Sequence, residues 1–153
     1  MIWFRIDNRL IHGQIIEAWL PYTRATHLVV CNESLSHDML RQQIMLLAVP
    51  SRIHVDFVAP VSFGAIVDNN ADVCETILVI FANCADAKAA YNAGCKFATL
   101  NIGNMHYGPG KRQVCEHVAL SEEEAACLHA FAAMDVCLDF RCVPNDITNV
   151  TDW

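Results

Sequence analysis

The sequence has little charge and no long apolar run. Only 18% of its residues are charged, and no uninterrupted apolar segment approaches the roughly 20 residues that a transmembrane helix needs. Arg5 and Asp7 interrupt the first apolar segment, so no secretory signal peptide of the usual form is present. Clustered Lys and Arg are also lacking, and the formal net charge is -7. We therefore expect a soluble cytoplasmic protein that has no nucleic-acid partner.

Paired cysteines at metal-binding spacing are absent as well. The chain has eight cysteines but no C-x-x-C pair, and its histidines are scattered. This pattern argues against a structural zinc site, and we predict no metal. Because most of the cysteines lie inside predicted strands and helices, we interpret them all as reduced, small core residues rather than a disulfide framework. They are Cys31, Cys74, Cys84, Cys95, Cys115, Cys127, Cys137 and Cys142.

What the sequence does have is a regular alternation of strand-like and helix-like segments. With 54% hydrophobic residues in 153, the chain is long enough for one domain over residues 1–153. The alternation predicts an α/β fold: a single-domain open, mainly parallel twisted sheet of about six to seven strands, with helices on both faces. The predicted strands are 2–6, 26–31, 53–58, 76–81, 96–102, a short edge strand 114–120, and 136–142; the predicted helices are 15–20, 37–48, 60–67, 87–93 and 121–133.

Helix ends are predicted from residues that start or stop helices. Pro21 is expected to end the first helix. Ser36 and Asp86 are expected to act as N-caps, because their side chains can accept hydrogen bonds from the first backbone N–H groups. Ser121 followed by Glu124 forms a capping box.

The segment Asp7–Gln14 places one histidine, His12, between an arginine and a glycine in a tight strand-to-helix turn. Such turns lie at the carboxyl edge of a parallel sheet, where ligands bind. The N–H groups at a helix start favour an anion, and Arg9 adds a planar cation suited to phosphate oxygens. These residues together predict a site that handles phosphate. The alternative is that His12 is structural or merely exposed.

A second region is expected at the same rim. Residues 103–112 form the longest irregular stretch, are rich in glycine and follow a predicted strand. Asn83 follows the all-apolar strand 76–81. If these strands are parallel, Asn83, Asn104 and His106 fall near the His12 turn. The alternative for the stretch 103–112 is an exposed surface loop.

The segment Arg5–Gln14, with Trp19 following, resembles the signature of the IIB subunits of the mannose, fructose and sorbose class of the bacterial phosphotransferase system. The resemblance extends through Asn101–Met105, Gln113 and Ser121. It implies that His12 accepts a phosphoryl group, on Nδ1, from the phosphohistidine of a IIA partner. The group then passes to a sugar during uptake through the membrane subunits IIC and IID. On this basis we expect a phosphotransferase without a cofactor, located at the inner face of the membrane through IIC and IID.

Within this expected site, Arg9 would neutralise charge on the phosphoryl oxygens, and Gly13 and Gln14 would bind them through backbone N–H groups. Arg5 and Asp7 are further candidates, either to contact phosphate or to orient Arg9 or the ring. They share one face of a strand, so the alternative is that they simply pair with each other. Trp19 is interpreted as a core residue rather than a sugar platform.

Three residues depart from the family pattern. Asn8 stands where the family usually has an aspartate, and Asn104 and His106 alter the segment that follows Ile102. We hypothesise that His106 contacts the phosphoryl group or shifts its pH dependence; the alternative is a solvent-facing loop histidine.

Two other functions stay open from the sequence. One is a regulatory phosphocarrier whose phosphorylated state is sensed by a partner, and the other is a small-molecule-binding α/β domain without chemistry. The sequence does not identify the sugar, and it is compatible with a homo-oligomer without defining the oligomeric state.

Overall fold

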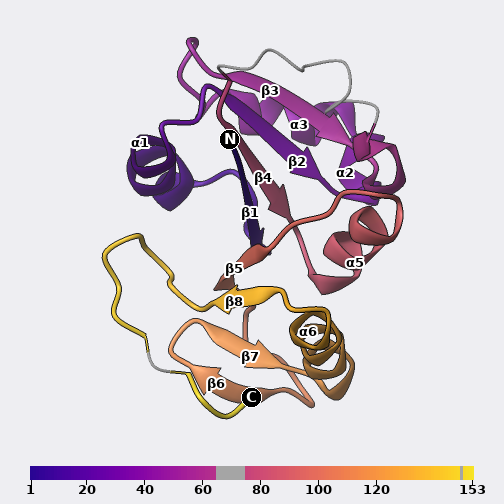
Figure 1. Ribbon diagram of the computed structural model, residues 1–153. Helices are drawn as coiled ribbons and strands as arrows, with labels where there is room; N and C mark the ends of the chain where they lie inside the picture. The colour runs from indigo at the N-terminus through magenta and orange to yellow at the C-terminus, as the bar shows by residue number, and fades with distance from the viewer. Residues whose placement is uncertain (65–74, 149) are drawn as a thin grey trace.

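Six parallel strands form one sheet in a computed structural model of the chain, which describes residues 1–64, 75–148 and 150–153 (Figure 1). Every neighbouring pair in this sheet runs parallel. Strand β1 lies between β4 and β5, so its carboxyl end is flanked on both sides. The strands, in their order across the sheet, are β3 (His54–Val58), β2 (His27–Cys31), β4 (Ile77–Phe81), β1 (Ile2–Asp7), β5 (Thr99–Asn104) and β8 (Cys137–Asp139).

Two apolar cores, one on each face of the sheet, follow from the alternation of side chains along its central strands. Leu28 and Leu78 point into one core, and their neighbours Val29 and Val79 point into the other. The first core packs against the helical segment that follows His12, and the second against α5 (Cys84–Asn92) and α6 (Glu122–Ala133). Figure 1 shows α1 and α5 on opposite sides of the sheet. The predicted α/β fold, with helices on both faces, is confirmed.

The first helix continues past Pro21, so the prediction that this residue ends it is wrong. A π-helical turn, η1 (Ile15–Trp19), runs directly into α1 (Leu20–Thr23). Pro21 occupies the first turn of α1, where a missing N–H costs little. The helix instead ends at Arg24, whose φ of 56° is left-handed.

Two predicted N-caps are also wrong, because a neighbouring residue takes the role. A short helix, α2 (Glu33–Ser36), precedes α3 (Met39–Leu46), and α3 is capped by Asp38 rather than Ser36. Asn83 caps α5 by accepting a hydrogen bond from the backbone N–H of Asp86, which lies buried in the first turn. The capping box of Ser121 is confirmed at the start of α6. The predicted helix 60–67 begins as η2 (Pro60–Ser62), and residues 65–67 lie outside the described residues.

The predicted edge strand 114–120 is instead part of a separate antiparallel hairpin. Strands β6 (Arg112–Cys115) and β7 (Val118–Leu120) pair with each other, and Met105 joins this hairpin to the end of β5 through a bridge with Val118. The last strand is shorter than predicted because the chain beyond Asp139 leaves the sheet. Its backbone carbonyls bond to side chains from β1 and the first helix, as described below.

The cysteines are only partly as expected. Burial raises the pKa of the Cys31 and Cys95 thiols, as expected for inert core residues. Cys84 and Cys127, however, are paired as a disulfide between α5 and α6, so the interpretation that all cysteines are reduced is wrong for these two. Their Cα atoms lie 6.4 Å apart because the two helices pack together, a proximity that sequence spacing does not reveal. Cys74 lies outside the described residues.

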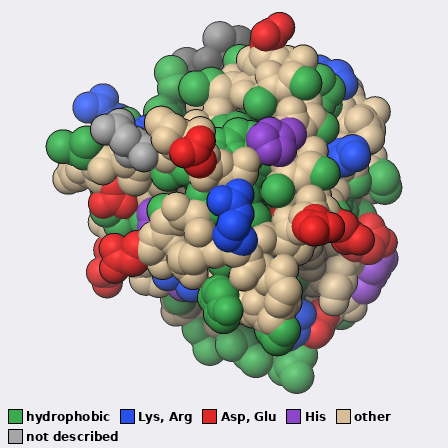
Figure 2. Space-filling view, turned by 90° about the horizontal axis from the view of Figure 1, so that it is seen from below, with side chains coloured by type: hydrophobic (Ala, Val, Ile, Leu, Met, Phe, Trp, Pro, Cys, Tyr) green, Lys and Arg blue, Asp and Glu red, His purple; other side chains and the backbone are tan. Residues whose placement is uncertain are grey.

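In the described ranges, no helix is both long and apolar enough to cross a bilayer. On the face shown in Figure 2, Lys and Arg side chains are spread out and do not gather into one patch, and Asp and Glu side chains lie among them.

Candidate functional site

His12 lies in the turn that follows β1, at the carboxyl edge of the parallel sheet. The turn is closed by a hydrogen bond from the N–H of Leu10 to the carbonyl of Asp7, and Leu10 has a left-handed φ of 57°. Leu10 and Ile11 are buried in the core beneath the turn, and the His12 carbonyl accepts from the N–H groups of Ile15 and Ile16. The backbone around His12 is therefore fixed from both sides.

Both ring nitrogens of His12 face hydrogen-bond acceptors. Nδ1 lies 2.8 Å from the carbonyl oxygen of Leu10, a distance at which it donates a hydrogen bond. Nε2 lies 3.8 Å from Oδ2 of Asp7 and has no hydrogen-bond partner, and the side chain is 20% exposed. The imidazole is thus partly covered, with a buried carboxylate on its Nε2 side.

Asp7 is fully buried and connects the residues of the site. Its carboxylate accepts hydrogen bonds from the backbone N–H, Nε and Nη2 of Arg9, each at 3.1 Å, and from Nη2 of Arg5 at 2.7 Å. Burial lowers the pKa of Arg9, but the hydrogen bonds and the charge of Asp7 outweigh it and leave that pKa raised. Nη2 of Arg9 also donates to Oε1 of Gln14 at 2.8 Å, which fixes the guanidinium beside the turn.

Arg5 pairs with Asp7, which is the alternative that the sequence left open beside contact with phosphate. It is 1% exposed, it bonds to Asp7 and Asn101, and its guanidinium lies 4.6 Å from the ring centre of Trp19. Burial lowers its pKa, an effect that the charge of Asp7 partly offsets. In this structure Arg5 supports Asp7 from beneath and does not reach the surface of the site.

Trp19 belongs to the core, as interpreted from the sequence. Its side chain is 1% exposed, and its indole N–H donates to the carbonyl of Cys142 at 2.9 Å. The same carbonyl accepts from Nη2 of Arg5 at 3.0 Å. The chain that follows β8 is thereby tied to the floor of the site.

The predicted second loop is only partly beside the first. Asn104 and His106 both contact Asn8: the Asn104 amide donates to Oδ1 of Asn8, and the Asn8 amide meets Nδ1 of His106. The N–H of Asn8 also bonds to the carbonyl of Asn104 at 3.1 Å. Asn83 lies at the carboxyl end of β4 as expected, but its side chain is engaged in capping α5.

Sequence reasoning missed the supporting role of Gly103 and Asn101. Asn101 lies opposite Arg5 in the register of β1 and β5, and its amide donates to the carbonyls of Asp139 and Arg141, each at 3.0 Å. A Cβ atom built on Gly103 would overlap the guanidinium of Arg5. A glycine within a strand is a known sign of such close approach, and it was the available signal here.

Substitution of Gly103 by alanine is expected to lower the free energy of unfolding by about 1–3 kcal/mol, because the added methyl displaces a buried, fully bonded arginine. Thermal and urea unfolding measure this change. The matched control is Gly108→Ala, since a Cβ there meets nothing within 4 Å. Equal stability of the two variants would contradict the tight packing of Arg5 against Gly103.

A cavity of about 530 Å³ opens beside Arg9 and Gln14. Its wall combines the two loops of the site with the chain that follows β8. The lining residues are Arg9, Gln14, Asn104, Cys115, Glu116, His117, Cys142, Val143, Asp146, Ile147 and Thr148. The site is therefore open to a second molecule on the Arg9 side.

Comparison with known proteins identifies the family. Residues 1–152 match the model of the phosphotransferase system sorbose subfamily IIB component. The chain is 32% identical over 142 residues to a sorbose-specific EIIB component of Klebsiella pneumoniae, covering 93% of this chain and 87% of that protein. It is 26% identical over 142 residues to a mannose-specific EIIAB component of Escherichia coli, covering 93% of this chain and 44% of that protein.

The fold agrees with this match. The crystal structure of the IIB domain of the sorbose permease from Klebsiella pneumoniae superposes with a TM-score of 0.89 at 31% identity, covering 98% of this chain and 93% of that one. The resemblance inferred from the His12 segment is thus confirmed over nearly the whole chain. The protein belongs to the sorbose subfamily of IIB components of the phosphotransferase system, which act in sugar phosphotransfer for uptake.

Proposed function

We propose that the phosphoryl group is carried by His12 and that residues 1–153 form a single phosphocarrier domain. The observation that supports this most is the arrangement around one partly exposed imidazole: a fixed backbone turn, the cation of Arg9, and a buried carboxylate on the Nε2 side. Phosphoryl transfer needs mainly position and charge neutralisation, and this arrangement supplies both. Neither a metal nor a nucleotide enters the proposed reaction.

The phosphorylated atom is proposed to be Nδ1, which implies a movement of the ring. A nitrogen that donates a hydrogen bond has no lone pair free for attack, and Nδ1 faces the Leu10 carbonyl. The ring must therefore turn away from Leu10 and lose the Nδ1 proton before it attacks. Asp7 can then accept a hydrogen bond from Nε2–H, which keeps the lone pair on Nδ1 and orients the ring.

In this proposal the transfer consists of two displacements at phosphorus. The Nδ1 lone pair of His12 attacks the phosphoryl group of the IIA phosphohistidine, the donor N–P bond breaks, and its electron pair returns to the donor imidazole. In the second step a sugar hydroxyl oxygen attacks phosphorus, the N–P bond of His12 breaks and returns its electron pair to Nδ1, and the hydroxyl proton passes to solvent water. Arg9 would neutralise charge on the transferred oxygens in both steps, while Gly13 and Gln14 would contribute N–H groups from the helix start.

Phosphorus and nitrogen NMR of the labelled protein test the atom assignment. After incubation with phosphoenolpyruvate and the general phosphotransferase components with a IIA donor, we expect a signal of Nδ1-phosphohistidine that disappears in acid. Mass spectrometry of peptides from the same sample should locate the phosphate at His12. A signal of Nε2-phosphohistidine would contradict the proposed ring movement, and a phosphate on another residue would contradict the assignment of His12.

The partners are known in general terms from the family: a IIA donor and the membrane components IIC and IID. For this chain we propose direct transfer from a IIA phosphohistidine, and location at the inner face of the membrane through IIC and IID. The cavity beside Arg9 supports the proposal because it leaves room for part of a second molecule next to Arg9 and Gln14, which flank His12 in the sequence. The sugar is not identified by these residues, since relatives with the same fold carry names of different sugars.

His106 is proposed to tune the site indirectly. Its Nδ1 contacts the amide of Asn8, so it reaches the turn through Asn8 and not through the imidazole of His12. Asn104 donates a hydrogen bond to Asn8 across the two loops. The contacts support a role in holding the loops together.

A further inference from the structure

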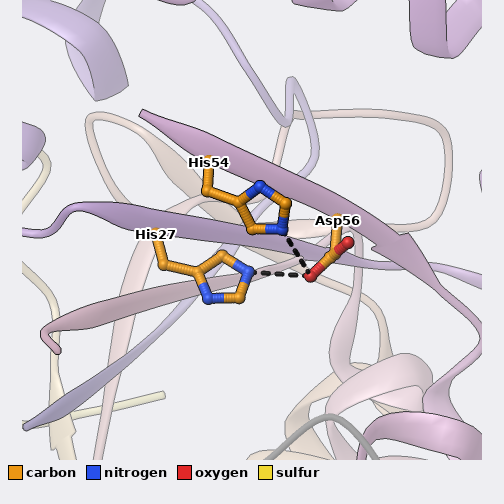
Figure 3. A group of neighbouring side chains, drawn as sticks. All are labelled: His27, His54 and Asp56. Atoms are coloured by element: carbon orange, nitrogen blue, oxygen red, sulfur yellow. Dashed lines mark hydrogen bonds and ion pairs between the residues drawn. The ribbon is translucent and has the colours of Figure 1, made fainter. Parts of the chain in front are cut away.

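A second group of polar side chains lies at the amino ends of β2 and β3, whereas His12 follows the carboxyl end of β1 (Figure 3). His27 and His54 are directly paired in the register of these two parallel strands. Asp56 follows His54 by two residues, so the two side chains share one face of β3. Oδ2 of Asp56 lies 2.8 Å from Nε2 of His27 and 3.3 Å from Nε2 of His54.

His27 is held in a setting that suits a metal ligand. Its side chain is 1% exposed, and its Nδ1 faces Oε1 of Glu75 at 3.6 Å without a hydrogen bond. Metal-ligating histidines commonly direct their second ring nitrogen at a carboxylate, which fixes the tautomer that leaves the lone pair on the ligating nitrogen. If the Glu75 carboxylate moves slightly closer, it can accept a hydrogen bond from Nδ1–H of His27, which leaves the lone pair on Nε2 for a metal.

The geometry points to a divalent transition-metal site of the Zn²⁺ type, with His27, His54 and Asp56 as its ligands. One donor atom from each residue lies within 4.8 Å of the others. Zinc bonds nitrogen and oxygen at about 2.0–2.2 Å, so ligand atoms can stand up to roughly 4 Å apart. His54 is 64% exposed and is free to make the small adjustment, and solvent can complete the coordination. Two imidazoles and one carboxylate favour zinc-type metals over Mg²⁺ or Ca²⁺, which prefer oxygen.

The group is independent of the phosphoryl site. His27 pairs with Ile77 at the level of Ile2 on β1, whereas His12 follows the other end of β1. Five residues of strand separate these levels, which is roughly 16 Å. A metal here would join β3, the edge strand, to β2, and would resist detachment of that edge. The expected consequence is stabilisation rather than catalysis.

Isothermal titration of the untagged chain with ZnCl₂ tests this inference, together with Co²⁺, whose visible absorption reports the coordination number and geometry of the bound ion. We expect one Zn²⁺ per chain, a higher melting temperature with Zn²⁺, and a Co²⁺ spectrum of low coordination number. His54→Ala should raise the Kd by about 10-fold or more, and Asp56→Asn should do the same. Because His54 is largely exposed, the first variant should fold normally.

Two controls separate this group from other histidines. His37 stands 3.5 Å from Glu33 on the surface, so His37→Ala removes an exposed histidine–carboxylate pair that lacks a third ligand. His12→Ala removes the histidine near Asp7. Neither change should alter the Kd for Zn²⁺. If the folded wild type binds no Zn²⁺, the inference is wrong. Zn²⁺ binding that survives His54→Ala, or that is lost in His12→Ala, would also overturn it.

Discussion

Changing His12 to alanine is expected to abolish labelling by a phosphorylated IIA donor, whereas His106→Ala leaves the chain able to carry one phosphate. His12 presents the imidazole that lies beside Arg9 and Asp7 at the end of the central strand. His106 lies in the neighbouring loop, where its ring nitrogen contacts the amide of Asn8. Without an imidazole at position 12, no nucleophile stands at this point, and alanine offers no substitute.

The experiment uses intact-mass measurement after incubation with the donor, followed by acid treatment. Loss of labelling must not arise from unfolding, and among the described residues the His12 side chain makes one hydrogen bond, to the Leu10 carbonyl. Circular dichroism should therefore show an unchanged fold for His12→Ala. Full labelling of this variant would refute His12 as the carrier, and loss of labelling in His106→Ala alone would move the assignment to the second loop.

The second large effect is expected at Arg9. Its guanidinium is held by Asp7 and Gln14 beside the turn, with its pKa raised, so it remains charged throughout transfer. Removing one preorganised donor from a transition state commonly costs about 10²–10³-fold in rate. We expect Arg9→Ala to slow phosphoryl transfer by about 100-fold. Arg9→Lys should be intermediate, because an ammonium cannot reproduce the two-pronged geometry of the guanidinium.

Rapid-quench measurement of transfer from labelled IIA distinguishes these variants. Arg41→Ala is the matched control, since Arg41 is an exposed arginine on α3 outside the site. It removes the same charge from the protein and should leave the rate unchanged. A wild-type rate in Arg9→Ala would remove this arginine from the mechanism. A similar slowing in both arginine variants would assign the effect to overall charge.

The sheet could be predicted from the sequence because its central strands are continuous apolar runs with burial on both faces. The run Ile77–Phe81 is of the apolar kind typical of a strand buried on both faces of a parallel sheet. Helix caps were harder, since Asn83 and Asp86 offer similar side chains three residues apart and only the backbone conformation decides between them. The early end of β8 at Asp139 was also hard to predict, because the carbonyls of Arg141 and Cys142 bond to Arg5 of β1, which lies far away in the sequence.

In the candidate site, too, some residues could be predicted from the sequence and others could not. His12 and Arg9 are recognisable because they lie in one short segment with the glycine and the helix start. The burial of Arg5 was not predictable, because it requires Gly103 to leave space and Asn101 to bond the guanidinium, and both contacts arise only on folding. The pairing of His27 with His54 likewise depends on the register of β2 and β3, so scattered histidines gave no sign of it.

The buried ion network beneath His12 has an electrostatic consequence. Asp7 with Arg5 and Arg9 leaves the resting site with one net positive charge. A phosphoryl group brings about two negative charges, so the summed charge of these three side chains and the phosphoryl group becomes about -1 when the group is loaded. A partner that contacts the site therefore meets a different local charge in the loaded and the unloaded state. The unloaded site thus favours an anionic phosphoryl donor, and the loaded site favours a cationic group on the acceptor.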